Sequence, residues 1–148
     1  VMAPPLRKMK SCGVLLFRTE PRLQFLLMRH ANRLDLPKGH MEEGEDEYST
    51  AMRELREETG YGVDDVTLQK GFRHEVIYHA PYRRFGGDMV EKTLVVFLGR
   101  LLVAREPKLT EHMGFQWVVW NPPHRLQPNT VDGLLMHVED FLRDGGAG

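Results

Sequence analysis

Three glutamates, Glu54, Glu57 and Glu58, stand three and four residues apart in the sequence. These spacings share one face of an α-helix, so the three carboxylates would converge. Their mutual repulsion costs on the order of a few tenths of a kcal/mol in water, and more where solvent is partly excluded. A divalent cation removes this conflict, and oxygen ligands favour Mg²⁺, for which Mn²⁺ can substitute, over zinc. Because Mg²⁺ commonly bridges carboxylates and phosphates, we expect a polyphosphate substrate.

A simpler interpretation is a solvated acidic surface balanced by Arg53 and Arg56, which is the usual state of an arbitrary acidic helix. The neighbouring residues argue against it. An apolar stripe occupies the adjoining arc of the helix, so the carboxylates stand at the border of the buried side, and that stripe is Tyr48, Ala51, Met52 and Leu55.

The wider spacing is more specific. Gly39 is followed after five residues by Glu45, and after seven more by R-E-L-R-E-E-T-G-Y over residues 53–61. This pattern resembles the Nudix box, G-x5-E-x7-R-E-U-x-E-E-x-G-U, in which U is a bulky apolar residue. Tyr61 stands where the family usually has an aliphatic residue, a departure that concerns packing more than chemistry.

The resemblance implies a role for each matching residue. The carbonyl oxygen of Gly39 and the carboxylates of Glu54, Glu57 and Glu58 would bind the metal, while Glu45 and Arg53 would orient the box. Glycine suits position 39 because the backbone must approach the ion closely. The metal would activate a water for attack on a phosphoanhydride. Glu57, Glu58 or a carboxylate from another loop could accept the proton, and the sequence leaves this choice open.

Segments outside the box resemble the asymmetrical diadenosine tetraphosphate hydrolase branch of the family, from about residue 10 to 142. The matching segments are 10–13, 37–40, 71–78, 92–93 and 111–117. The resemblance implies Lys92 as a catalytic phosphate clamp and Glu111 as a further metal ligand or base. It also implies a set of substrate-binding residues, which comprises Lys38, His40, Tyr78, Lys92 and His112.

Each of these residues could also have a purely structural role. Lys92 could be a solvated edge lysine, and His40 a merely exposed loop residue. Tyr78 could pack on a strand instead of stacking on adenine. Glu111 could be an ordinary turn acid. Trp117 and Trp120 are expected in the core.

Two departures keep other substrates open. Leu34 and Asp35 stand where the branch commonly has an aromatic residue, and a second base-stacking aromatic near Pro128 is missing. Arg83 and Arg84 make the 80–91 insert more basic than adenine requires and could hold extra phosphates. A diphosphoinositol polyphosphate hydrolase, or a 5′-triphosphate RNA or cap-type hydrolase, is therefore the alternative. A non-catalytic Nudix-fold nucleotide-binding module is the competing class.

The elements that must position these residues follow from periodicity. Strands are expected over 12–17, 24–28, 63–70, 72–79, 93–103 and 115–120, the first two as a hairpin, with loops over 34–44 and 80–91, the latter a mobile surface insert. Helices are expected over 45–59, stopped by Gly60, and over 130–143. Strands on both sides of the first helix predict an α/β/α sandwich with a mixed sheet between helices.

Composition sets further limits. With 148 residues, 41% of them hydrophobic, we expect one domain over 1–148 with flexible ends at about 1–9 and 144–148. Lys and Arg number 20 against 21 Asp and Glu, so the chain lacks a basic field for long nucleic acid. No apolar run is long enough for a membrane span. The lone Cys12 excludes an internal disulfide and favours a cytoplasmic protein. We expect a monomer or weak dimer.

Overall fold

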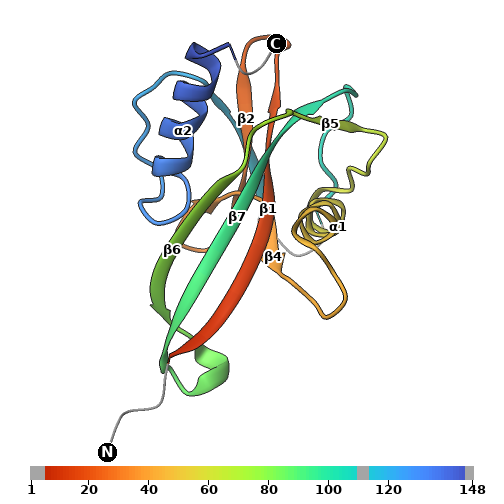
Figure 1. The fold of residues 1–148 in the computed structure, drawn as a ribbon. Coiled ribbons are helices and arrows are strands. Elements are labelled where there is room, and N and C mark those ends of the chain that lie inside the picture. The colour runs from red at the N-terminus through yellow and green to blue at the C-terminus, as the bar shows by residue number, and fades with distance from the viewer. Residues whose placement is uncertain (1–5, 110–113, 146–148) are drawn as a thin grey trace, which may run out of the picture.

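The structure is a computed structural model that describes residues 6–109 and 114–145. Its strands form one mixed sheet with a helix on each side, as Figure 1 shows. The elements in chain order are β1 (Arg7–Arg18), β2 (Gln24–Arg29), β3 (Leu34–Asp35), β4 (Lys38–His40), α1 (Glu47–Thr59), β5 (Val66–Leu68), β6 (His74–Pro81), the 3₁₀ turn η1 (Arg83–Phe85), β7 (Met89–Leu101), β8 (Gly114–Val119) and α2 (Asp132–Arg143).

Two long parallel strands form the centre of the sheet. β1 and β7 pair from Arg7 opposite Val90 to Phe17 opposite Arg100. The other pairings are antiparallel: β2 and β4 add to β1, β5 and β6 add to β7, and β3 and β8 add to β2. The predicted hairpin of the first two strands is confirmed, because Phe17 lies opposite Phe25.

Alternation along β1 divides the core into two layers. Cys12, Val14 and Leu16 pack toward α1, whereas Leu15 packs toward α2. The α2 layer also contains alternate residues of β7, which are Leu94, Val96 and Leu98. The two helices therefore cover opposite faces, and the predicted α/β/α arrangement is confirmed (Figure 1).

Helix α1 begins two residues later than predicted. Asp46 is its N-cap, with its side chain accepting from the Ser49 backbone while the Ser49 hydroxyl accepts from the Asp46 backbone. Gly60 ends the helix in the left-handed conformation, at φ 81°, as predicted. The predicted apolar stripe needs one correction: Tyr48 is 48% exposed, so the buried stripe begins at Ala51.

Other predicted boundaries change where short elements or turns lie. The 34–44 loop contains β3 and β4, two and three residues long, because both pair with longer strands. The 63–70 strand shrinks to β5. The 80–91 insert begins with the end of β6 and finishes with the start of β7, and the turn between them contains η1. Helix α2 begins at Asp132 instead of residue 130.

At the N-terminal end β1 begins at Arg7, within the segment 1–9 for which flexibility was predicted. Trp117 and Trp120 pack against the two core layers while remaining partly exposed. None of the helices within the described ranges has the length and apolar character needed to cross a membrane.

Candidate functional site

The three carboxylates of α1 differ in exposure, as expected for a border position. Glu58 is buried at 7% exposure, the Glu54 side chain is 15% exposed and that of Glu57 is 58% exposed. The helical turn between Glu54 and Glu58 keeps both acids on the side facing the sheet. The acidic face therefore runs from the protein interior to solvent.

Strand β4 lies directly against this acidic face. A Cβ atom added to Gly39 would stand 2.1 to 2.4 Å from the carboxylate atoms of Glu54, so no larger residue fits without displacing that group. The backbone N–H of Lys38 donates to Oε2 of Glu58 at 2.7 Å. Pairing of Gly39 with Cys12 of β1 fixes the strand from the other side. Gly39 and two of the three glutamates are thus held together.

Arg53 connects the rest of the box. Its guanidinium donates to both Glu45 oxygens, at 2.6 and 3.0 Å, and to the His40 carbonyl oxygen at 2.9 Å. It also contacts Glu54 at 2.8 Å and Glu57 at 3.2 Å. Hydrogen bonding to Arg53, followed by the Glu42 backbone N–H, lowers the pKa of Glu45 to about 2. Arg53 therefore ties the loop before α1 to the acidic face.

The buried acids carry a charge that their surroundings disfavour. Burial, followed by the charge of Glu54, raises the pKa of Glu58 to about 8. Burial also raises the pKa of Glu54, against the opposing effect of Arg53. A bound cation would reverse both tendencies by compensating the negative charge. The electrostatics therefore suit a cation at this place.

The donor atoms fit a hard divalent ion, since carboxylate oxygens and the Gly39 carbonyl oxygen are the ligand types that Mg²⁺ prefers. These donor atoms do not all point to one position in this structure. Within the described ranges, no group of three or more His, Cys, Asp or Glu side chains is close enough to hold a metal. Glu57 accepts a hydrogen bond from Arg53 at 3.2 Å, so its carboxylate would have to turn for all three acids to share one ion.

A cluster of basic side chains lies on the opposite face of β4. Lys38 and His40 are opposite Gly13 and Ser11, whose neighbours on β7 point toward α2. Burial lowers the pKa of His40, and the charges of Lys92, Lys38 and Arg84 lower it further. Burial and the charges of Lys38 and Arg33 lower the pKa of Lys92. We call Arg33, Lys38, His40, Arg84 and Lys92 the cationic cluster.

Asp35 anchors this cluster, a role that the sequence did not indicate. It is 2% exposed and accepts from the Thr130 hydroxyl at 2.9 Å. Its other carboxylate oxygen stands 3.8 Å from Lys38 Nζ and 3.5 Å from Arg33 Nε. The residue treated as a departure from the family pattern therefore positions two of the basic groups.

Tyr82 was also missed. Its hydroxyl lies 3.4 Å from Nδ1 of His40, and Lys92 Nζ stands 5.2 Å from its ring centre. The only available signal was its place in the basic insert, beside Arg83 and Arg84, which are both exposed. Its proximity to His40 depends on the pairing of distant strands.

Tyr78 lies opposite Lys92 in the pairing of β6 with β7 and packs partly buried against the α2 layer. This contact agrees with the alternative that Tyr78 packs on a strand. Stacking of Tyr78 on a base stays a prediction. Glu111 and His112 lie outside the described residues. The structure thus joins Gly39, Glu45, Arg53 and the three glutamates by direct contacts on one face of β4, whereas Lys38 and His40 lie on its other face and Tyr78 and Lys92 on the paired strands β6 and β7.

Comparison with known proteins identifies a matching family model and named relatives. The model of the NUDIX domain matches residues 7–137. The asymmetrical bis(5′-nucleosyl)-tetraphosphatase of Mus musculus is 31% identical over 122 residues, which cover 74% of this chain and 78% of that protein. The protein of the same name from Sus scrofa has the same identity and coverage.

Solved structures support the fold. A C. elegans Ap4A hydrolase in a binary complex matches with a TM-score of 0.79, over 92% of this chain and 98% of that chain, at 24% identity. A second structure of the C. elegans enzyme matches with a TM-score of 0.71 at 22% identity. The family match spans most of the chain, and the box residues occupy one connected site, so the chain belongs to the NUDIX family and is a Nudix hydrolase.

Proposed function

We propose that the chain hydrolyses a phosphoanhydride bond in a nucleoside polyphosphate with Mg²⁺, for which Mn²⁺ can substitute. Diadenosine tetraphosphate, cleaved to ATP and AMP, is the favoured substrate. One observation carries the proposal: β4 has the acidic face of α1 on one side and the cationic cluster on the other. A metal-bound polyphosphate needs both kinds of group within a short distance. The tetraphosphatase names of the relatives support the same substrate class.

On the acidic side, the Gly39 carbonyl oxygen with Glu54, Glu57 and Glu58 would hold the cation, which supplies charge neutralisation and activation of the attacking water. Arg53 and Glu45 keep the box in position through their paired hydrogen bonds. Glu57 and Glu58 are the candidate proton acceptors, and Glu111 remains a candidate from sequence alone.

On the basic side, Lys38, His40 and Lys92 would bind the phosphates. The lowered pKa of His40 favours its neutral form. If the Tyr82 hydroxyl donates to Nδ1, the proton of the neutral ring resides on Nε2, which can then donate to a phosphate oxygen. Lys92 supplies a compact positive charge for the negative charge that develops on the leaving phosphate. Tyr78 would stack on a base, with His112 as a further contact.

A diphosphoinositol polyphosphate is the second candidate substrate, because Arg84 of the cluster and its neighbour Arg83 are both exposed and could bind additional phosphates. A 5′-triphosphate RNA or cap-type substrate follows. A non-catalytic binding module is the competing class. The three box glutamates argue against it, since such a module has no need of a buried repulsive acidic face.

The test is an assay of diadenosine polyphosphates, diphosphoinositol phosphates, 8-oxo-dGTP, NADH and 5′-triphosphate RNA with Mg²⁺, with the products resolved. We expect ATP and AMP from the tetraphosphate. Glu58→Gln should lower kcat by about 1,000-fold or more, because it removes a buried charge next to the cation, whereas the exposed Glu43→Gln should not. Two ADP molecules as the main product would contradict the cleavage position. Tight binding without turnover would favour the module.

A further inference from the structure

The turn between β6 and β7 is a defined structure that carries aromatic and basic side chains. Backbone hydrogen bonds close it: Tyr82 N–H donates to Asp88, and Gly87 N–H donates to Tyr82. Gly86 and Gly87 take left-handed conformations at φ 68° and 85°, which suit glycine. Backbone contacts of this kind can form with any side chain other than proline at position 82.

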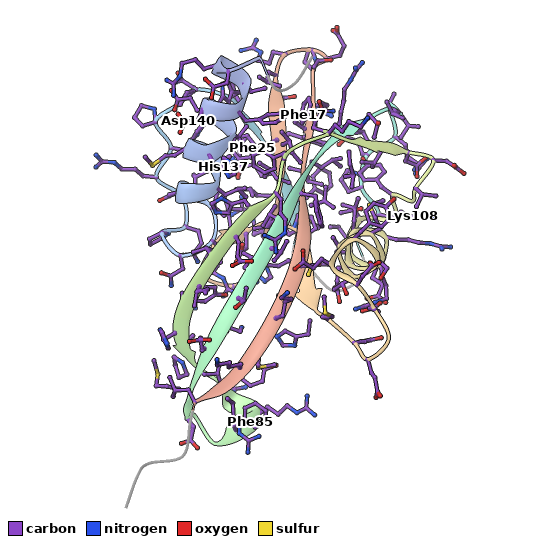
Figure 2. All side chains as sticks on the ribbon, viewed as in Figure 1. Phe17, Phe25, Phe85, Lys108, His137 and Asp140 are labelled. Carbon is purple, nitrogen blue, oxygen red and sulfur yellow. The ribbon has the colours of Figure 1, made fainter. Side chains whose placement is uncertain are left out.

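The rings of this turn belong to neither core layer. Tyr82 and Phe85 are half-buried, with ring centres 5.4 Å apart, and neither packs in the clusters beside α1 or α2. Figure 2 shows Phe85 at the end of the sheet remote from α2. The Arg7 guanidinium lies 4.1 Å and that of Arg84 5.9 Å from the Phe85 ring centre. Rings with adjacent cations form a surface that suits a nucleobase joined to phosphates.

This surface is continuous with the cationic cluster. The Tyr82 ring contacts His40, with ring centres 5.6 Å apart, and Lys92 Nζ lies 5.2 Å from the Tyr82 ring centre. Lys92 also lies opposite Tyr78 on β6. Lys92 therefore has the Tyr82 ring near its ammonium group and Tyr78 opposite it on the paired strand. A polyphosphate bound at Lys92 would have a tyrosine within reach on each of these two sides.

We propose that Tyr82 and Arg84 bind the second nucleoside end of the substrate and thereby make the site selective for polyphosphates with a nucleoside at both ends. Tyr82 supplies the stacking face and Arg84 contacts the adjoining phosphate. The inference rests on the proposed function for the class of substrate. It adds the residues that distinguish a dinucleoside polyphosphate from a mononucleotide, and it supplies the second base contact that the segment near Pro128 lacks.

The test measures binding, so it does not depend on turnover. Methylene-bridged diadenosine tetraphosphate and ATP are titrated calorimetrically into the full chain with Mg²⁺. We expect Tyr82→Leu to weaken the dinucleotide about tenfold more than it weakens ATP, because the stacked base is lost from the dinucleotide alone whereas loss of the His40 contact is shared by both ligands. Arg84→Gln should weaken the dinucleotide about threefold. The exposed Arg22→Gln, at the other end of the sheet, is the matched control and should change neither.

Tyr82→Phe separates the ring from the hydroxyl. It keeps the stacking face but loses the contact with His40, so any weakening should be shared by both ligands and their affinity ratio should hold. The inference would be overturned if Tyr82→Leu lowered the affinity for both ligands equally or for neither. It would also be overturned if the wild-type chain bound neither ligand. If Tyr82→Leu changes the ratio of the two affinities but the wild-type chain shows no turnover, the inference holds and the proposed function is contradicted. If the wild-type chain turns over the dinucleotide but the ratio does not change, the proposed function holds and the inference is contradicted.

Discussion

The acidic face of α1 and the cationic cluster on the far side of β4 are built differently. The acidic face rests on short direct contacts: Arg53 to Glu45 at 2.6 Å and Lys38 N–H to Glu58 at 2.7 Å. The cationic cluster is joined by longer contacts, such as 3.8 Å from Lys38 to Asp35 and 5.2 Å from Lys92 to the Tyr82 ring. Its members also come from several separate segments.

This difference indicates a division of tasks. Short charge-assisted bonds hold groups in one arrangement, as metal binding and attack on phosphorus require. Looser contacts around a set of like charges leave room for phosphates and waters. We therefore expect substitutions in the acidic face to affect metal binding and attack by water, and substitutions in the cationic cluster to affect binding of the phosphates and stabilisation of their charge.

Among the substitutions that compare the two regions, Gly39→Ala should have the largest combined effect, on turnover and on stability together. The new Cβ would stand 2.1 to 2.4 Å from the Glu54 carboxylate atoms, so that carboxylate must move. We expect turnover to fall about 100-fold or more, because a displacement of that size misplaces a metal ligand, and stability to fall by about 1–3 kcal/mol. Steady-state kinetics and urea unfolding measure the two effects. Gly133→Ala is the control, since a Cβ there meets nothing within 4 Å. Unchanged turnover would show that the acidic face tolerates movement.

Lys92→Gln should have a smaller and different effect. It removes a half-buried charge on the basic side without touching the acids, so kcat/KM should fall about 100-fold. The rise in melting temperature on adding Mg²⁺ should match that of the wild type. The exposed Lys70→Gln controls for loss of charge. If Lys92→Gln also abolished the Mg²⁺-dependent rise in melting temperature, the two regions would not be separable.

The smallest effect concerns a histidine pair outside both regions. Nδ1 of His74 on β6 lies 3.0 Å from Nδ1 of His137 on α2, labelled in Figure 2, and burial and His137 lower the pKa of His74. A lowered folded-state pKa means that the unfolded chain binds the proton more readily, so this stability is present above about pH 6.5 and declines as the pH falls below it. His74→Gln should reduce the loss of stability between pH 7.5 and 5.5 by about 1 kcal/mol or less.

Urea unfolding at the two pH values measures this effect, and His79→Gln, on the same strand but paired only at 3.8 Å with Glu91, is the control. An equal change in both variants would assign the pH dependence to general charge. A change in turnover at pH 7.5 in His74→Gln would mean that the contact between β6 and α2 affects the site. Activity would then depend on a third region besides the acidic face and the cationic cluster.

The acidic face could be predicted because the residues that form it are close together in the sequence. The box residues lie in α1 and the short segment that precedes it, and the roles of Arg53 and Glu45 were implied by the resemblance to the Nudix box. Predicted boundaries failed where tertiary pairing creates short elements: β3 and β4, two and three residues long, show no periodicity of their own. Tyr82 and Asp35 could not be placed because their partners, His40 and Thr130, are 42 and 95 residues away.

Strand β4 has a consequence for how such a protein can change. Successive residues of a strand face opposite sides, so inserting or deleting one residue within 38–40 would put the lysine and the histidine on opposite faces and turn one of them toward the carboxylates of α1. The segment can vary in residue type at its ends but not in length. The turn at residues 82–88 has no such restriction, so a lineage could acquire new substrates by lengthening or shortening that hairpin while inheriting its hydrolytic chemistry intact.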